Sequence, residues 1–134
     1  MVKIVPHVGI GKVRLGMSRE EAEWLLVAGM QIDSRGDPPA VVFVQVGPRV
    51  SAVYREIDVF EEPADEVVAA IVRLEGLDPA HSPPGRHQYL FPTLNFVLWR
   101  GYVSDDPDDF QGYHFQAASV HTPGYYDRLW PQSA

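Results

Sequence analysis

Hydrophobic positions repeat every two residues over several short stretches of this chain, and every three to four residues over two others. The first spacing places apolar side chains on one face of a strand, and the second places them on one face of a helix. Taken in order, the pattern predicts the elements β-α-β-β-α-β-β-β.

Two helices are predicted from their capping and termination signals. Ser18 and Glu21 form a capping box ahead of an apolar stripe, so the first helix is expected at about residues 19–29. The second is expected at about residues 63–75. It begins at a proline beside acidic residues and ends at Gly76, which is followed by a leucine as in a Schellman motif.

The strands are predicted to pair as antiparallel neighbours, because most of their connections have the length of a hairpin. Residues 40–46 and 50–60 are expected to pair across a Gly-Pro turn, whereas 33–39 has the composition of a loop. Residues 94–100 and 113–121 are expected to be two long strands joined by an acidic connection. The first of these is apolar at nearly every position, which favours a place in the middle of the sheet.

These elements predict a single α+β domain over residues 1–134, because smaller pieces would be too short to bury a good core. We expect a mainly antiparallel sheet of about five to six strands, with the two helices packed on one face. The Pro-rich segment 78–85 is expected to be a surface loop, and the tail 122–134 to be irregular and aromatic. Shorter strands are expected at 2–5, 12–15 and 86–91.

Composition narrows the chemistry. The chain has no cysteine, which excludes disulfides, thiol catalysis, and zinc or iron–sulfur sites built on cysteine. Its N-terminus lacks the apolar core of a signal peptide, and its longest apolar run is too short to span a bilayer. We therefore expect a cytoplasmic protein.

Charge is distributed unevenly along the chain. Residues 1–55 carry 7 Lys/Arg and 5 Asp/Glu, whereas residues 56–134 carry 4 Lys/Arg and 13 Asp/Glu, a net charge of −9. The whole chain has a net charge of −7. Such a chain repels phosphate backbones and anionic lipids, so we expect neither nucleic acid nor a membrane as a partner. A basic partner protein is compatible with this charge.

Catalytic and metal-binding motifs find little support. The glycines around Lys12 lack the spacing of a phosphate-binding loop, and no Gly-x-Ser-x-Gly segment occurs. The five histidines show no metal-ligand spacing. The sequence therefore leans towards a non-enzymatic function and predicts no catalytic residue, metal or cofactor.

The acidic connection is the first candidate site. Its aspartates suit a docking loop for a cationic partner, although a solvated loop that discourages edge-to-edge aggregation has the same composition. Tyr102 and two acids before the second helix are secondary candidates. The predicted partner-binding residues are Asp105, Asp106, Asp108, Asp109, Tyr102, Glu61 and Glu62.

A second hypothesis places a pocket for a small anion or another small molecule between the sheet and the terminal aromatic residues. It would be lined by Trp99, Arg100, His114 and Tyr125, with Arg100 holding an anionic group. The competing interpretation is that these aromatics fill the second face of the sheet. A third possibility is a homodimer formed through an exposed strand.

The segment Gly9–Leu26 contains the run Leu-Gly-Met-Ser-Arg-Glu-Glu. It resembles the start of small bacterial α+β proteins that are uncharacterised or assigned as immunity proteins of polymorphic toxin systems. Leu98–Arg100 and Gly124–Asp127 are similar to segments of actinobacterial members. A similar turn begins outer-membrane assembly lipoproteins, but this chain lacks their lipobox cysteine. The resemblance implies no catalytic residues. Together with the acidic loop, it favours a non-enzymatic binding module of the immunity type that neutralises a basic partner such as a nuclease toxin.

Overall fold

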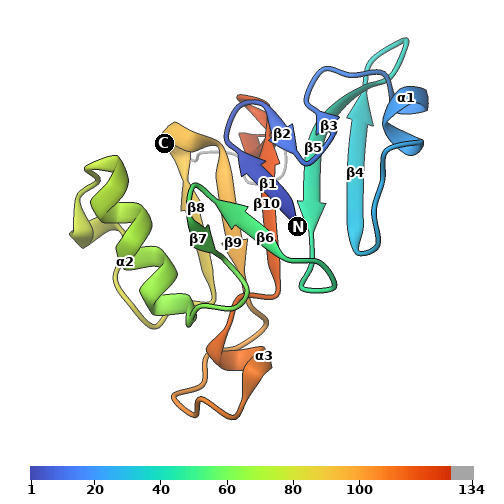
Figure 1. Cartoon of the computed structure of the whole chain (residues 1–134). Helices are drawn as coiled ribbons and strands as arrows, with labels where there is room; N and C mark the ends of the chain where they lie inside the picture. The colour runs from blue at the N-terminus through green and yellow to red at the C-terminus, as the bar shows by residue number, and fades with distance from the viewer. Residues whose placement is uncertain (128–134) are drawn as a thin grey trace.

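The chain folds into two five-stranded sheets that share one hydrophobic core (Figure 1). This computed structural model describes residues 1–127, and the last part of the predicted aromatic tail, 128–134, lies outside the described residues. The predicted α+β class with mainly antiparallel pairing is confirmed, but the strands divide between two sheets rather than forming one.

Sheet A contains five short strands in the order β3-β2-β1-β6-β7. The strands are β1 (Val2–Val5), β2 (Gly9–Ile10), β3 (Val13–Arg14), β6 (Ala52–Tyr54) and β7 (Ile57–Asp58). The neighbours β1 and β6 are parallel, with Ile4 opposite Tyr54, and the other neighbours are antiparallel. Both of these side chains are buried in the core.

Sheet B is antiparallel throughout, in the order β4-β5-β10-β9-β8. Its strands are β4 (Met30–Arg35), β5 (Ala40–Val46), β8 (Gln88–Phe91), β9 (Phe96–Trp99) and β10 (Ala117–His121). The predicted pairing of β9 with β10 is confirmed, with Phe96 opposite Val120. The predicted mid-sheet position of β9 is also confirmed, because β8 lies on its other side.

The predicted hairpin between residues 40–46 and 50–60 is wrong. After β5 the chain crosses to sheet A, where β6 pairs with β1 and places Ala52 and Tyr54 in the core. β5 instead pairs with β4 on one side and β10 on the other, and β4 includes part of the segment predicted to be a loop. In β4, Asp33 accepts a hydrogen bond from the hydroxyl of Tyr125, and the guanidinium of Arg35 lies over the ring of Tyr125. These polar residues therefore belong to one face of a strand and not to a loop.

The first helix is much shorter than the predicted span 19–29. Ser18 caps it as expected, accepting a hydrogen bond from the backbone N–H of Glu21 at 3.2 Å, but α1 extends only over Arg19–Glu23. Ala22 is its one buried residue, and Trp24 beyond it is 83% exposed. A helix without a buried face gains too little from packing to continue.

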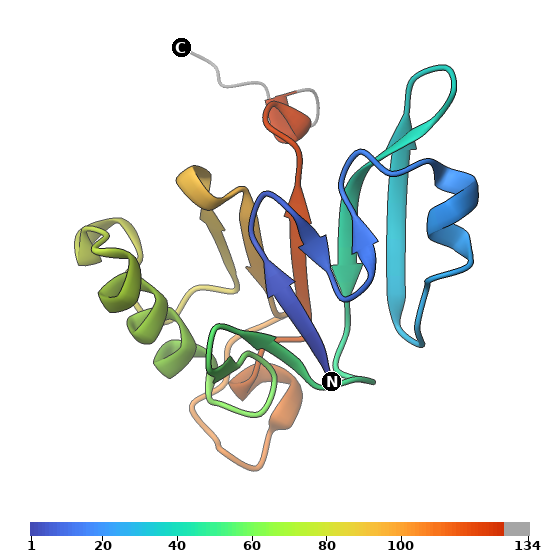
Figure 2. The same cartoon turned by 45° about the horizontal axis from the view of Figure 1, so that its top comes forward.

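The second helix is confirmed. α2 spans Ala64–Glu75 and ends with Gly76 at φ 64°, and the N–H of Leu77 donates to the carbonyl of Val72 at 2.9 Å, as a Schellman motif requires. A third helix, α3 (Phe110–Tyr113), forms within the acidic connection. Figures 1 and 2 show α1 and α2 at opposite ends of the molecule. None of the helices within residues 1–127 is long and apolar enough to cross a bilayer.

The end of the described chain returns to the outer face of sheet B, the face turned away from sheet A. The ring of Tyr125 stacks on Phe43 at 5.1 Å, and its hydroxyl donates to Asp33 at 2.9 Å. His121 lies beside this ring, is 4% exposed, and has no hydrogen-bond partner at Nδ1 among residues 1–127. Burial, aided by the charge of His7, lowers the pKa of His121 to about 4.

The buried His121 makes stability depend on pH. Between pH 6.5 and pH 4 the unfolded chain binds a proton at this residue and the folded chain does not, so stability falls as pH falls. His121→Phe keeps a ring but cannot titrate. We expect this variant to lose about 2 kcal/mol less of its free energy of unfolding than wild type between pH 6.5 and pH 4. Urea denaturation across this range measures the difference. His87→Phe, at an exposed position, is the matched control. The prediction is contradicted if the free energy of unfolding depends on pH equally in wild type and in His121→Phe.

Candidate functional site

A buried arginine lies where β9 ends. Arg100 is 1% exposed, although the preceding residue, Trp99, is 42% exposed on the outer face of sheet B. Successive strand residues point to opposite faces, so a side chain that follows an outward tryptophan is directed inward. Arginine tolerates this position because its planar guanidinium presents five donors to surrounding acceptors.

The guanidinium of Arg100 joins three segments that are distant in sequence. Its Nε and Nη2 donate to the carbonyl of Arg86 at 3.1 and 3.0 Å, and its Nη1 donates to the carbonyl of Gly112 at 3.0 Å. Nη2 also contacts the carboxylate of Asp65, in the first turn of α2, at 3.2 Å. The same carboxylate oxygen accepts the N–H of Gly85 at 3.1 Å. Arg100 therefore ties α2, the loop before β8 and the segment around α3 to sheet B.

The connection between β9 and β10 is an ordered loop with its own hydrogen bonds. The N–H of Ser104 donates to the carbonyl of Gly112 at 3.0 Å, and the hydroxyl of Tyr102 donates to Asp109 at 2.6 Å. This bond to Asp109 raises the pKa of Tyr102. Asp106 accepts the N–H of Asp108 at 2.9 Å. These bonds fix the carboxylates of Asp106 and Asp109 on the loop.

Gly112 allows this loop to close tightly. A Cβ atom there would lie 2.5 Å from Cε2 of the Tyr102 ring and 2.8 Å from Cβ of Ser104, closer than carbon atoms can approach. The glycine also supplies the carbonyl that Arg100 binds. Gly112 therefore both accepts a hydrogen bond from Arg100 and allows the loop to close against Tyr102 and Ser104.

Two acidic segments meet around this anchor. Residues 56–66 hold six Asp/Glu and residues 101–109 hold four, together ten of the chain's 18, and neither segment contains Lys or Arg. The first segment is also held to the end of α3, where Nδ1 of His114 bonds to the carbonyl of Glu62 at 3.0 Å. A small cleft between the two segments, of about 250 Å³, is lined by Asp65, Glu66 and Asp105.

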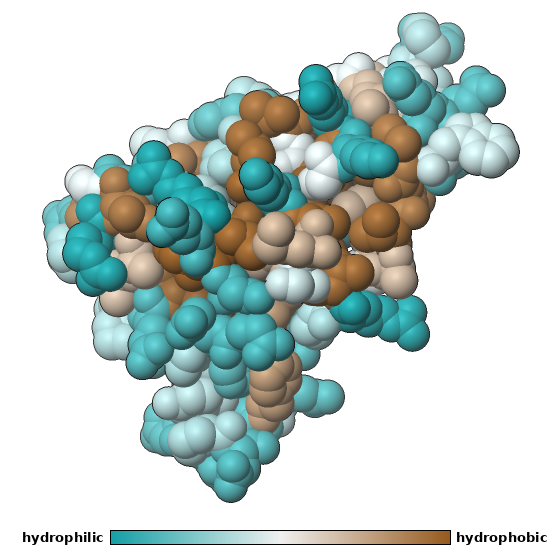
Figure 3. Space-filling view, in the orientation of Figure 1, coloured by the Kyte–Doolittle hydropathy of each residue, from teal (hydrophilic) through white to brown (hydrophobic). Residues whose placement is uncertain are grey.

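We call this region the acidic surface. Its members are Glu61, Glu62, Asp65, Glu66, Tyr102, Asp105, Asp106, Asp108 and Asp109. Figure 3 shows hydrophilic side chains over the lower part of the molecule, where α3 and its loop lie in Figure 1. All seven residues predicted to bind a partner belong to this surface, although 35 or more positions separate the segments in sequence.

Apolar side chains are exposed among these acids. Tyr102 is 48% exposed, Val103 40% and Phe110 44%. The ring of Phe110 stacks on His114 at a centroid distance of 4.3 Å, which fixes its position. Exposed aromatic residues within a charged rim are typical of protein-binding surfaces.

The four residues of the predicted anion pocket do not line one cavity. Trp99 points to the outer face of sheet B. Arg100 points inward and donates its hydrogen bonds to two backbone carbonyls and to Asp65. His114 is buried against α3, and Tyr125 lies on Phe43 at the other end of the sheet. The alternation of side chains along β9 separates the first two, and Arg100 has a structural role.

The sequence pointed to neither Asp65 nor Glu66 as site residues. Both lie in the first turn of α2, where acidic side chains are expected because they complement the positive end of a helix. The burial of Arg100, whose guanidinium binds Asp65 and places α2 beside the loop, cannot be read from the sequence. Within residues 1–127, no group of three or more His, Asp or Glu side chains is arranged to hold a metal ion.

Comparisons with known proteins add no assignment. No protein-family model matches this chain, and neither the curated proteins nor the solved structures contain a significant match.

Replacing Arg100 should release the anchored segments. Arg100→Met keeps most of the volume of the side chain, but it removes the donors to the carbonyl of Arg86 and one of the two donors to the carbonyl of Gly112. We therefore expect a loss of about 2–4 kcal/mol in the free energy of unfolding. Chemical denaturation gives this value, and limited proteolysis should show faster cleavage within residues 101–113. Arg49→Met, at an exposed position, is the control and should change stability little. A loss as small as that of the control would show that Arg100 is not an anchor.

Proposed function

We propose that this protein is a non-enzymatic binding module of the immunity type, which uses the acidic surface to bind a basic partner protein such as a nuclease toxin. The supporting observation is the junction of two acidic segments around Arg100, which concentrates charge that the sequence distributes over two regions. A nuclease binds phosphates with cationic side chains, and a cluster of carboxylates can occupy the same groups.

The composition of the surface suits this role in a second respect. Charged groups at a rim mainly accelerate association and select the partner, whereas buried aromatic side chains supply much of the affinity. The acidic surface has both parts, since Tyr102 and Phe110 are exposed among carboxylates. The hydrogen bond from Tyr102 to Asp109 holds one aromatic ring in place before binding, which lowers the entropy lost on association.

Neutralising the acidic surface tests this proposal. The variant Glu61→Gln, Glu62→Gln, Asp105→Asn, Asp108→Asn changes exposed acids whose carboxylates make no hydrogen bond within the described residues. At low salt, the wild-type protein should retain a basic protein from an extract of its native host, and high salt should release it. We expect the variant to bind the captured protein about 10- to 100-fold more weakly.

A control with the same change in charge separates a specific surface from general electrostatics. Four exposed acids in and near α1 and the β4–β5 turn serve this purpose: Glu20→Gln, Glu21→Gln, Glu23→Gln and Asp37→Asn. The control should bind within a factor of about two to three of wild type. Equal weakening of both variants, or capture of no basic protein at either salt concentration, would contradict the proposal.

A further inference from the structure

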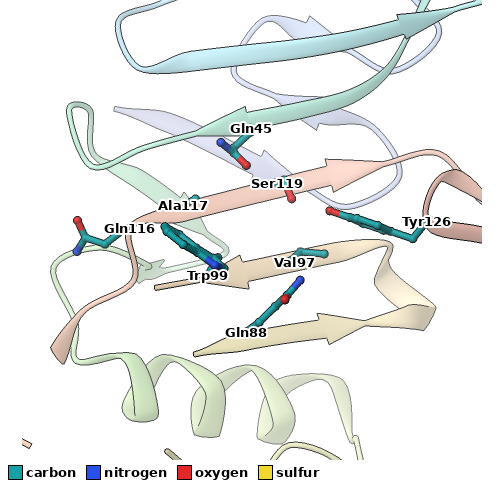
Figure 4. Close-up of a pocket in the computed structure, with 8 residues that line it drawn as sticks. All are labelled: Gln45, Gln88, Val97, Trp99, Gln116, Ala117, Ser119 and Tyr126. Carbon is teal, nitrogen blue, oxygen red and sulfur yellow. The ribbon is translucent and has the colours of Figure 1, made fainter. Parts of the chain in front are cut away.

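A second concave region lies on the outer face of sheet B, away from the acidic surface. It is a groove of about 350 Å³ that crosses β5, β10, β9 and β8. Figure 4 shows the side chains that line it. This volume lies within the range of small-molecule sites. The lining residues are Gln45, Gln88, Val97, Trp99, Gln116, Ala117, Ser119 and Tyr126.

The register of the sheet explains the shape of the groove. Ser119 lies opposite both Gln45 and Val97 on the neighbouring strands, and Ala117 lies opposite Trp99. The shorter side chains of Ala117, Ser119 and Val97 form the floor of the groove. The longer side chains of Gln45, Gln88 and Trp99 rise around this floor. In Figure 4, Trp99 and Tyr126 lie at opposite ends of this floor.

The polar groups of the groove are uncharged. Within the described residues, the side-chain amides of Gln45 and Gln88 have no hydrogen-bond partner, and they lie on opposite sides of the floor in Figure 4. Each amide offers two N–H donors and one carbonyl acceptor. At one end of the groove, the hydroxyl of Tyr126 is hydrogen-bonded with the hydroxyl of Ser119, a residue that is 3% exposed. None of the described residues that line the groove carries a charge at neutral pH that would favour an ionic ligand.

We propose that this groove binds a neutral polyhydroxylated ligand, the chemistry of a saccharide. Neighbouring hydroxyl groups of a sugar donate and accept together, as the amides of Gln45 and Gln88 do. The C–H face of a pyranose ring is apolar and flat, which suits contact with the exposed ring of Trp99. A peptide strand fits less well, because the backbones of β10 and β9 already pair with strands on both sides.

A titration with neutral disaccharides tests this inference. Cellobiose, maltose and lactose would each be added to the 15N-labelled protein, and NMR would follow the indole N–H of Trp99 and the side-chain amides of Gln45 and Gln88. We expect at least one of the three sugars to shift all of these signals with one dissociation constant. Glucuronate, an anionic sugar, should bind more weakly because the described lining of the groove offers it no cation.

Substitutions show whether the shifts come from the groove. Trp99→Ala should weaken binding of the active sugar by about tenfold or more. Trp24→Ala, which removes an 83% exposed tryptophan beside α1, should leave the dissociation constant unchanged. Gln45→Ala is a second variant, which removes one amide from the groove but leaves both aromatic rings in place. The inference is overturned if no sugar shifts these signals at millimolar concentration, or if Trp99→Ala binds as wild type does.

Discussion

The burial of one arginine side chain determines how the parts of this protein are placed. Arg100 is 1% exposed, and its cation is balanced by Asp65, a carboxylate that remains half exposed, and by the carbonyls of Arg86 and Gly112. A buried charge is tolerated only where such partners surround it. Helix α2, the loop before β8 and the segment around α3 are therefore held to the end of sheet B together.

This constraint also brings like charges together. Ten carboxylates belong to the two segments around the anchor, and neither segment supplies a cation. Their mutual repulsion opposes folding, although acids in the first turn of α2 gain from the helix dipole and exposed charges are screened by salt. A basic partner would relieve this repulsion when it binds. The same physical feature thus accounts for the cost of the arrangement and for the binding proposed for it.

Local signals in the sequence predicted the helix α2, its Schellman end, and the pairing of β9 with β10. Each depends on residues that are close in the chain or on a strongly apolar run. The parallel pairing of β1 with β6 was not predictable in this way, because it joins segments about fifty residues apart. The early end of α1 also depends on tertiary burial, since only Ala22 of that helix reaches the core.

The acidic loop was recognised from its composition, but its extension onto α2 was not. An arginine that follows an apolar strand gives no sign in the sequence that it is buried, and the acids at the start of α2 are expected at any helix N-terminus. The predicted pocket around Trp99 and Arg100 failed for a simple reason, since successive residues of a strand face opposite sides. Trp99 instead lines a groove that crosses four strands, β5, β10, β9 and β8, and is closed at one end by Tyr126.

If the two acidic segments act as one binding surface, a short cationic peptide should bind both of them at once. An NMR titration of the whole protein with tetralysine measures this. We expect the backbone N–H signals of the non-proline residues in 61–66 and 105–109 to shift together with one apparent dissociation constant, and added salt to abolish both sets of shifts. Equal shifts at Glu20 and Glu21 of α1, or different dissociation constants for the two segments, would show that the segments do not form one surface.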